Sequence, residues 1–363
     1  MKRLIWWSLL LWVIMAAGCI SELDVQLEQT AFIAINGVIS NSPEGRRILV
    51  TRQQGTAAQG PIVASVGEVY KDGTLEAELQ VGNEGELLLP DGFVIEEGAS
   101  YHVEIRTDEG KVYHSLPQVV QPRLTVDTLT HVVEERIGGV SQTGIPIQAL
   151  FVNILATVTV PADPAASELY RWQVNEAWSR TEVTNPTDPL DVIQKCYPTV
   201  EVEELPVTIL TTDNFTPGTE LQIQVATRRI DDSFDEKHYF NVYTHGIDQR
   251  AFRFYNAAQG LIASDGNLYD EQPAPIRGNL FNVDEPEDLV LGYVEFALAD
   301  TTRIGLYSFD LQSRRPHRCL DFNPVCPVLF GPNGEPVIPP CKCWDCDIVF
   351  GTESLIRPDY WED

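Results

Sequence analysis

The sequence predicts a mostly-β protein made of two β-sandwiches, with one packed helix and a Cys-rich C-terminal tail. Short runs rich in Val, Ile and Thr alternate apolar and polar residues, and turn clusters separate them at spacings of about 8 to 12 residues. The 363 residues include 24 Pro and 25 Gly, a composition that favours strands and turns over long helices. A chain of this length is typical of two domains, at about 150 residues each.

The N-terminal segment predicts export and a lipid anchor. Two basic residues precede an apolar run, Leu4–Met15, and small residues then lead to a cysteine in Ala16–Cys19. This is the layout of a secretory signal peptide, since a membrane-spanning helix needs about 20 apolar residues. The ending resembles a bacterial lipobox, which implies a signal peptide over 1–18, lipidation of Cys19 by fatty acyl chains such as palmitate, and a lipidated tether over 19–28. An ordinary signal peptide that ends near a cysteine is the alternative.

The residues around the anchor and the overall charge indicate where the protein acts. Ile20 follows the cysteine, where an Asp would signal retention in the inner membrane, so we expect a lipid-anchored protein of the outer membrane, on its periplasmic or its cell-surface face. The formal net charge of −28 disfavours nucleic acid as a partner, because the phosphate backbone would be repelled.

The first β-sandwich is predicted over 29–122. Its strands alternate apolar and polar residues, as in Tyr101, Val103 and Ile105, whose neighbours are polar. The segment Glu97–Tyr101 resembles the corner of immunoglobulin-like and fibronectin-like domains, in which a tyrosine caps a loop before a late strand.

The second β-sandwich is predicted over 123–310. Trp172 lies in an aromatic-rich strand and is expected in its core, and 289–296 and 303–309 are expected to pair as closing strands. One helix is inserted at 248–264, with Asp248 as its N-cap and apolar residues at helical spacing. We expect this helix to pack on a sheet, with a partner-binding groove filler as the alternative.

The tail over 311–363 holds most of the candidate disulfide cysteines. An even number of cysteines in an exported protein favours disulfides over a zinc site, and a redox motif would need a βαβ context that the tail lacks. Fifteen pairings are possible, and the sequence does not choose among them. The six disulfide candidates are Cys196, Cys319, Cys326, Cys341, Cys343 and Cys346.

The remaining polar residues form no recognisable catalytic or cofactor motif. No metal-binding histidine array, serine nucleophile elbow or phosphate loop is present, so we expect neither a cofactor, a resident metal nor an enzyme. Carboxylates cluster at 231–236 and at 284–288, where solvated turns are favoured over a calcium site because neither has EF-hand order. A long loop, Asp265–Pro286, is rich in Gly, Pro and Asn and is expected to be ordered without forming a strand.

Three segments carry a resemblance to a known family. They are the helix Asp248–Ile262 with its Phe-Tyr pair, the run Pro275–Asn279 that leads to Leu291–Tyr293, and Cys343–Cys346 followed by Arg357–Trp361. Together with the lipobox, they resemble a family of Bacteroidetes outer-membrane lipoproteins that is classed as a domain of unknown function. Family members are commonly encoded beside TonB-dependent receptors, and the resemblance implies no catalytic residues.

The expected function is therefore a non-enzymatic accessory binding or docking component of a TonB-dependent transport complex. The alternative is a structural or adhesive cell-surface lipoprotein without a transporter partner. Long ordered loops on rigid sandwiches often carry function, so the loop Asp265–Pro286 is the expected partner-facing surface. Its candidate contact residues are Tyr269, Arg277, Asn279 and Phe281.

Overall fold

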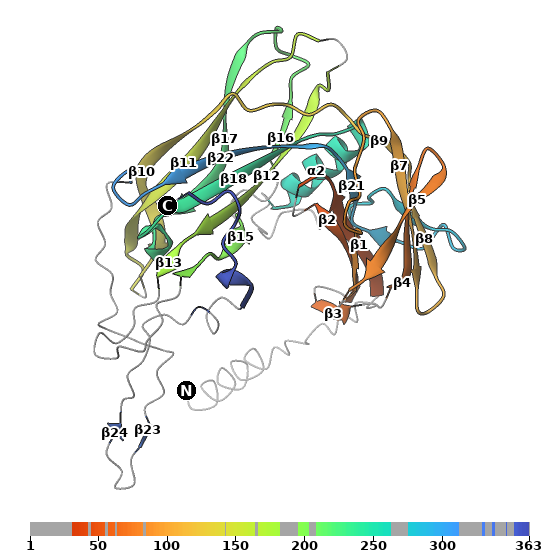
Figure 1. The fold of residues 1–363 in the computed structure, drawn as a ribbon, viewed down its shortest axis with the longest axis horizontal. Coiled ribbons are helices and arrows are strands. Elements are labelled where there is room, and N and C mark those ends of the chain that lie inside the picture. The colour runs from red at the N-terminus through yellow and green to blue at the C-terminus, as the bar shows by residue number, and fades with distance from the viewer. Residues whose placement is uncertain are drawn as a thin grey trace, which may run out of the picture.

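The computed structural model describes residues 31–42, 45–54, 57–61, 64–82, 85–141, 143–163, 166–181, 195–202, 208–262, 275–311, 329–330, 336–337, 346 and 352–362. These residues form two β domains that lie side by side, with one α-helix where they meet (Figure 1). The predicted mostly-β fold is thus confirmed. Within these residues, none of the helices has the length and the apolar composition that crossing a bilayer requires.

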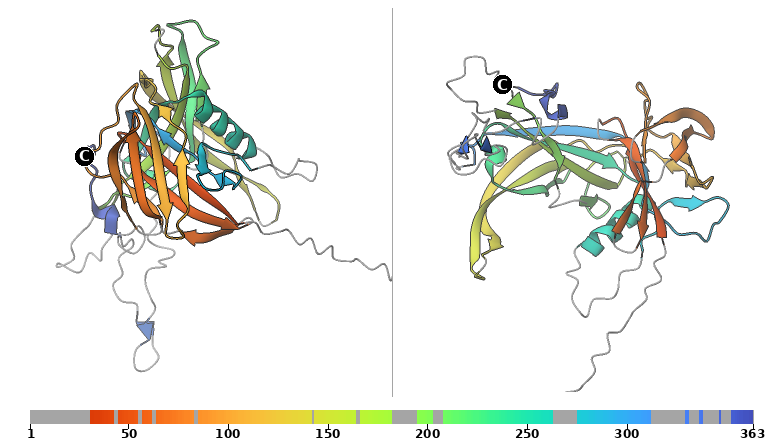
Figure 2. Two further views of the ribbon diagram at one scale, coloured as in Figure 1. Left: turned by 90° about the vertical axis from the view of Figure 1, so that its right-hand side faces the viewer. Right: turned by 90° about the horizontal axis from the view of Figure 1, so that it is seen from below.

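The first domain is a 12-stranded sheet that curls around one core (Figure 2). Alternation along the strands sends Ile35, Ile48, Tyr101 and Phe296 into this core, where each is fully buried. The order along the main path is β19-β8-β7-β4-β5-β6-β2-β1-β20, while β3, β9 and β21 pair at its sides. The strands are β1 (Ala31–Ile39), β2 (Arg46–Gln54), β3 (Ala57–Pro61), β4 (Ala64–Lys71), β5 (Thr74–Val81), β6 (Glu86–Leu88), β7 (Ser100–Thr107), β8 (Val112–Ser115), β9 (Gln118–Val119), β19 (Leu280–Asn282), β20 (Val290–Leu291) and β21 (Val294–Phe296).

The last three of these strands correct the predicted domain limits. We assigned 280–296 to the second sandwich, but β19 pairs with β8, and β20 and β21 run parallel to β1. The loop predicted over 265–286 therefore contains a strand, β19. The predicted pairing of 289–296 with the strand that follows it was wrong, because β20 and β21 pair with β1 instead. Parallel pairing needs a long crossover, here the whole second domain, and no local pattern can indicate such a partner.

The second domain is a sandwich of two sheets around one core. A three-stranded sheet, β10-β11-β17, faces a five-stranded sheet in which β12 and β18 are central. Trp172 is 1% exposed and is among the largest side chains of this core, as predicted. The strands are β10 (Thr128–Val140), β11 (Pro146–Thr159), β12 (Leu169–Trp178), β15 (Thr199–Glu201), β16 (Thr208–Thr211), β17 (Glu220–Arg229), β18 (His238–Gly246) and β22 (Ala299–Leu306), and two short pairs are β13 (Arg180–Thr181) with β14 (Lys195–Cys196) and β23 (Leu329–Phe330) with β24 (Pro336–Val337).

The helix α2 (Gln249–Ile262) begins as predicted, and two short 3-10 helices are η1 (Asp232–Phe234) and η2 (Thr352–Leu355). The Asp248 carboxylate accepts a hydrogen bond of 2.8 Å from the Ala251 N–H, which is the contact of an N-cap. Only the first half of the helix packs, because Ala251 is buried whereas Ile262 is 60% exposed. Its aromatic residues contact Tyr293 of the first domain and Leu169 of the second, so the helix contributes to the domain interface.

Two further predictions are confirmed at particular residues. The Tyr101 hydroxyl accepts a hydrogen bond of 3.1 Å from the Glu96 N–H, which is the loop-capping contact of a corner tyrosine. Cys196 and Cys346 form a disulfide with a Cα–Cα distance of 5.6 Å. Near this bond the C-terminal Trp361 is buried against Tyr239 and Tyr197, so the end of the chain is held on the second domain.

Candidate functional site

An open cleft of about 770 Å³ lies between the two domains and is the candidate site. Its lining residues come from β1, β2 and β6 of the first domain, from β12 and β15 of the second domain, and from α2. Its volume is in the range of about 300 to 1,000 Å³ that small-molecule sites occupy. It is lined by Asn36, Gly37, Val38, Arg46, Arg47, Leu49, Leu88, Arg171, Gln173, Asn175, Thr199, Val200, Glu201, Phe254, Tyr255 and Tyr293.

Strand alternation explains how β12 supplies its wall. Successive side chains point to opposite faces of a sheet, so Tyr170, Trp172 and Val174 enter the core of the second domain. The intervening Arg171, Gln173 and Asn175 then face the first domain and line the cleft.

The same alternation produces the facing wall. Ile35 and Ile48 point into the first core, while Asn36, Val38 and Leu49 point to the cleft. Leu49 remains 38% exposed there, so this wall presents apolar surface as well as polar groups. The cleft therefore lies between the outer faces of two sheets that each bury their other face.

The floor of the cleft is a buried ion pair between the domains. Arg171 on β12 donates from Nε to Glu295 Oε2 at 3.0 Å and from Nη2 to Oε1 at 2.9 Å, and Glu295 lies on β21. The side chains of Arg171 and Glu295 are 6% and 0% exposed. The Arg171 guanidinium also stacks 4.8 Å above the ring of Tyr255, which links α2 to the same floor. The two hydrogen bonds from Arg171 to Glu295 are the strong, bidentate form of an arginine–carboxylate pair.

The ionisation of this cluster follows from burial and from the pair itself. Burial alone would raise the pKa of Glu295, but the Arg171 guanidinium and the neighbouring polar groups hold that pKa below its ordinary value. His245 on β18 is fully buried next to the pair, and burial together with the Arg171 charge lowers its pKa to about 3. Burial also raises the pKa of Tyr255 well above its ordinary value. At neutral pH the floor of the cleft therefore holds one cation, Arg171, and one anion, Glu295, while His245 and Tyr255 beside them are neutral.

One buried polar atom in the cleft lining, Asn175 Oδ1, lacks a hydrogen-bond partner among the described residues, and Asn175 is 5% exposed. The hydroxyl of Tyr293, which is 4% exposed, interacts with Asp248, and burial together with that carboxylate raises the pKa of Tyr293 above its ordinary value. A buried acceptor without a donor costs about 1 to 3 kcal/mol, so such atoms are rare unless something else pairs with them.

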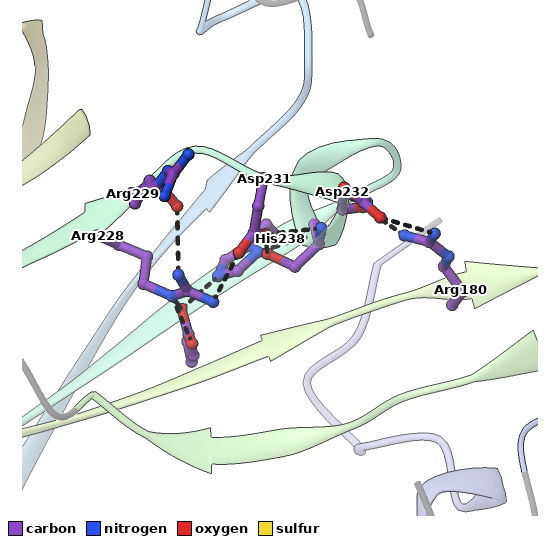
Figure 3. Close-up of polar contacts among 8 residues, drawn as sticks. Arg180, Arg228, Arg229, Asp231, Asp232 and His238 are labelled. Atoms are coloured by element: carbon purple, nitrogen blue, oxygen red, sulfur yellow. Dashed lines mark hydrogen bonds and ion pairs between the residues drawn. The ribbon is translucent and has the colours of Figure 1, made fainter. Parts of the chain in front are cut away.

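A second polar network lies on the other side of the second domain and is fully engaged (Figure 3). Glu176 accepts Arg228 Nε at 2.9 and 3.0 Å, and the buried His238 approaches it at 3.2 Å. Burial would raise the pKa of Glu176, but the hydrogen bond from His238 and the Arg228 charge lower it. His238 stacks on the Phe234 ring at 3.9 Å and is 0% exposed, so no substrate reaches it. We assign this network to structure.

That network also decides the role of the carboxylates at 231–236. Asp231 pairs with Arg228 at 3.1 Å, and Asp232 and Asp235 approach Arg180 at 3.8 and 3.9 Å (Figure 3). The expectation of a solvated turn fits Asp232, whose side chain is 60% exposed, while Asp231 and Asp235 are half-buried beside arginines. No group of three metal-type side chains that could hold an ion occurs in the part of the chain that the structure describes.

The structure gives the predicted contact residues of the long loop different degrees of burial. Arg277 is exposed and Phe281 is half-buried on β19, but Asn279 is 2% exposed. The Asn279 side chain donates to the Val294 carbonyl at 2.7 Å and accepts from the Val294 N–H at 3.0 Å, so it fixes β21 and cannot face a partner. Tyr269, the lipidation residue Cys19 and the candidate cysteines Cys319, Cys326, Cys341 and Cys343 lie outside the described residues.

Sequence reasoning missed the cleft. The alternation of Arg171, Gln173 and Asn175 with core residues was visible, but a polar strand face usually meets solvent. The facing wall comes from residues more than 80 positions earlier in the chain, so only the arrangement of the domains brings the two walls together.

Comparison with known proteins gives a family assignment. The family model described as Domain of unknown function (DUF4249) matches residues 20–303, which includes both β domains and the cleft, and ends before the cysteine-rich tail. No curated protein matches the sequence. The match covers well over half of the chain, and the protein therefore belongs to the family described as Domain of unknown function (DUF4249).

Proposed function

We propose that this protein is a lipid-anchored binding protein of the outer membrane and a non-enzymatic accessory component of a TonB-dependent transport complex. Cys19 carries the anchor, and the tether after it holds the two β domains at the membrane. The observation that supports a binding role most strongly is the interdomain cleft, whose size suits a small molecule and whose lining combines apolar and polar groups.

The chemistry of the cleft favours binding over catalysis. Its lining offers arginine, amide, hydroxyl and aromatic groups and the exposed carboxylate of Glu201, but no nucleophile that is activated by a neighbouring base. Glu295 and His245 next to the floor are fully buried and engaged with Arg171 or its surroundings. Such a site can hold and orient a molecule for transfer to a transporter without changing it.

A second candidate function is adhesion without a transporter, and the β10–β11 hairpin favours it. The hairpin extends away from the second domain (Figure 2), and branched aliphatic side chains are exposed near its end. Exposed aliphatic residues in such a position are typical of contact surfaces. They are Ile137, Val140, Ile145 and Ile147, between 46% and 64% exposed.

Labelling and co-purification test the proposal. In cells grown with radiolabelled palmitate, the native protein should take up label and its Cys19→Ser variant should not. The tagged native protein, solubilised in mild detergent, should co-purify with a receptor-type β-barrel. Recovery of the labelled protein without any such barrel would contradict the transport role. Loss of surface attachment with normal uptake in a strain carrying Ile145→Asp and Ile147→Asp would favour adhesion.

A further inference from the structure

We propose that the β10–β11 hairpin inserts its tip, residues 137–147, into the bilayer that holds the lipid anchor, so that the protein contacts its membrane at two points. The inference rests on the proposed function only for the anchor at Cys19, and it goes beyond that function by assigning a membrane-contact surface to the folded domains. It is carried by the composition of the tip, its internal hydrogen bonds and its position relative to the start of β1.

The hairpin tip is uncharged and apolar. It contains no Asp, Glu, Lys or Arg, although 21% of the chain is charged and the formal net charge is −28. Its large aliphatic side chains are between 46% and 64% exposed, and they are Ile137, Val140, Ile145 and Ile147. Exposed apolar patches of this kind mark contact with a protein partner or with a membrane. The tip is therefore a contact surface, and its geometry decides between the two occupants.

The aliphatic side chains of the tip lie on both faces of the hairpin. Val140 is paired with Pro146, and Ile147 is the next residue on β11. Cross-strand partners share a face and successive residues alternate, so Val140 and Ile147 point to opposite faces. A protein that docks on one face would leave the other face in water. A lipid phase surrounds the tip and covers both faces, which favours the bilayer as the occupant.

The turn at the tip pairs its own polar backbone groups. The Ser141 N–H donates to the Ile145 carbonyl at 2.8 Å, and the Gly144 N–H donates to the Ser141 carbonyl at 2.9 Å. The Ile145 N–H also donates to the Ser141 hydroxyl oxygen at 2.9 Å. Polar backbone groups are costly in an apolar phase unless they are paired within the structure. The internal pairing of this turn therefore lowers the cost of moving it from water into lipid.

The tip lies on the side of the molecule from which the chain leads back to the anchor. In both views of Figure 2, the end of the β10–β11 hairpin and the start of β1 lie on one side, and the C-terminus lies on the opposite side. Ala31, the first residue of β1, lies twelve positions after Cys19, and a chain of that length spans at most about 43 Å. A membrane that holds the anchor on that side would face the tip.

Fluorescence quenching tests this inference on the mature lipidated protein, reconstituted through its anchor into phosphatidylcholine vesicles with brominated acyl chains. Bromine quenches tryptophan only on close approach, so a tryptophan in the tip reports insertion. Ile145→Trp should be quenched at least threefold more than Ile356→Trp, each measured as the difference from the native protein. Ile356 is the matched control because it is 72% exposed and follows η2 near the C-terminus, on the opposite side of the molecule (Figure 2).

A second substitution separates insertion from mere proximity to the membrane. Ile147→Asp, added to Ile145→Trp, should lower the quenching at least threefold, because a charged side chain is costly in the acyl region. Ile356→Asp, added to Ile145→Trp, should leave the quenching unchanged. Equal quenching of Ile145→Trp and Ile356→Trp, or quenching that Ile147→Asp does not reduce, would overturn the inference.

The anchor and the hairpin contact fail in distinguishable ways. A protein that takes up palmitate label but shows no quenching in Ile145→Trp would keep its proposed anchor and lose the hairpin contact. An unlabelled chain that is still quenched when added to the same vesicles would contradict the anchor and support the hairpin contact. Absence of quenching, together with the loss of surface attachment described above, would assign the hairpin to adhesion instead.

Discussion

Arg171 and Glu295 form a buried two-donor ion pair between residues 124 positions apart, and this pair joins the two β domains at the floor of the cleft. Glu295 reaches it because β21 has returned to the first sheet beside β1, while Arg171 comes from the central strand of the second domain. The pair thus sets the relative position of the two walls. A cleft between two domains is preorganised only if its walls are held in a fixed geometry, and the buried pair holds them.

Glu295→Gln should destabilise the protein strongly, because it leaves the Arg171 charge buried without a counter-ion. Breaking a buried pair by removing one partner costs about 3 to 5 kcal/mol. Urea unfolding at pH 7 measures the effect. Glu109→Gln at the exposed pair with Arg52 is the matched control and should change the unfolding free energy by less than about 0.5 kcal/mol. Equal effects of the two substitutions would contradict the role of the pair.

Stability should fall as the pH drops from 6.5 towards 3, partly through His245. Its pKa in the folded protein is about 3 against an ordinary 6.5, so only the unfolded chain takes up its proton in this interval. Between pH 6.5 and 5 this single group should remove about 1.6 kcal/mol of stability. His245→Gln should flatten that part of the profile, and His131→Gln on β10 should not. A profile that is unchanged in His245→Gln would show that the histidine is not held neutral.

The buried carboxylates should affect the stability of the protein at lower pH than His245 does. The pKa values of Glu295 and Glu176 are held below their ordinary values, so their stabilisation is complete above about pH 4.3 and is lost as the pH falls through the folded values. The two variants Glu295→Gln and His245→Gln should therefore differ in where their stability profiles depart from that of the native protein. Urea unfolding from pH 7 to pH 3 distinguishes them.

The disulfide Cys196–Cys346 should contribute strongly to stability, because it closes a loop with a sequence separation of 150. The loop-entropy model gives about 5 kcal/mol for a loop of this length. The double variant Cys196→Ser and Cys346→Ser should unfold at lower urea and should release the tail to limited proteolysis first. Peptide mapping without reduction should recover Cys196 joined to Cys346, and a different partner for Cys196 would contradict the structure.

Gly278→Ala should be poorly tolerated. A Cβ atom at this position would lie 1.5 Å from the carbonyl oxygen of Gly292, which is backbone and cannot rotate away. We expect a loss of about 3 kcal/mol, at the upper end of the range for overpacking. Gly260→Ala in α2 is the control, since a Cβ there meets nothing within 4 Å and alanine favours helix by about 1 kcal/mol. Equal urea midpoints for the two variants would contradict this close approach.

Local sequence patterns were enough to predict several elements of the fold, but they predicted no part of the cleft. Asp248 as N-cap, the corner tyrosine Tyr101 and the core residue Trp172 each depend on neighbours within a few residues or on strand alternation. Asn279 was misassigned because an Asn in a Pro- and Gly-rich run resembles a loop residue, while its actual partner is the backbone of Val294.

The sequence by itself determined a β-rich chain, the N-cap of α2 and the corner tyrosine Tyr101, since these depend on composition and on short-range spacing. The tertiary structure decided which cysteine meets Cys346, that 280–296 completes the first sheet, and that Asn36 and Asn175 face one cleft. The physical reason is that these contacts join residues far apart in the chain, and their energy depends on burial and on geometry that no local pattern contains.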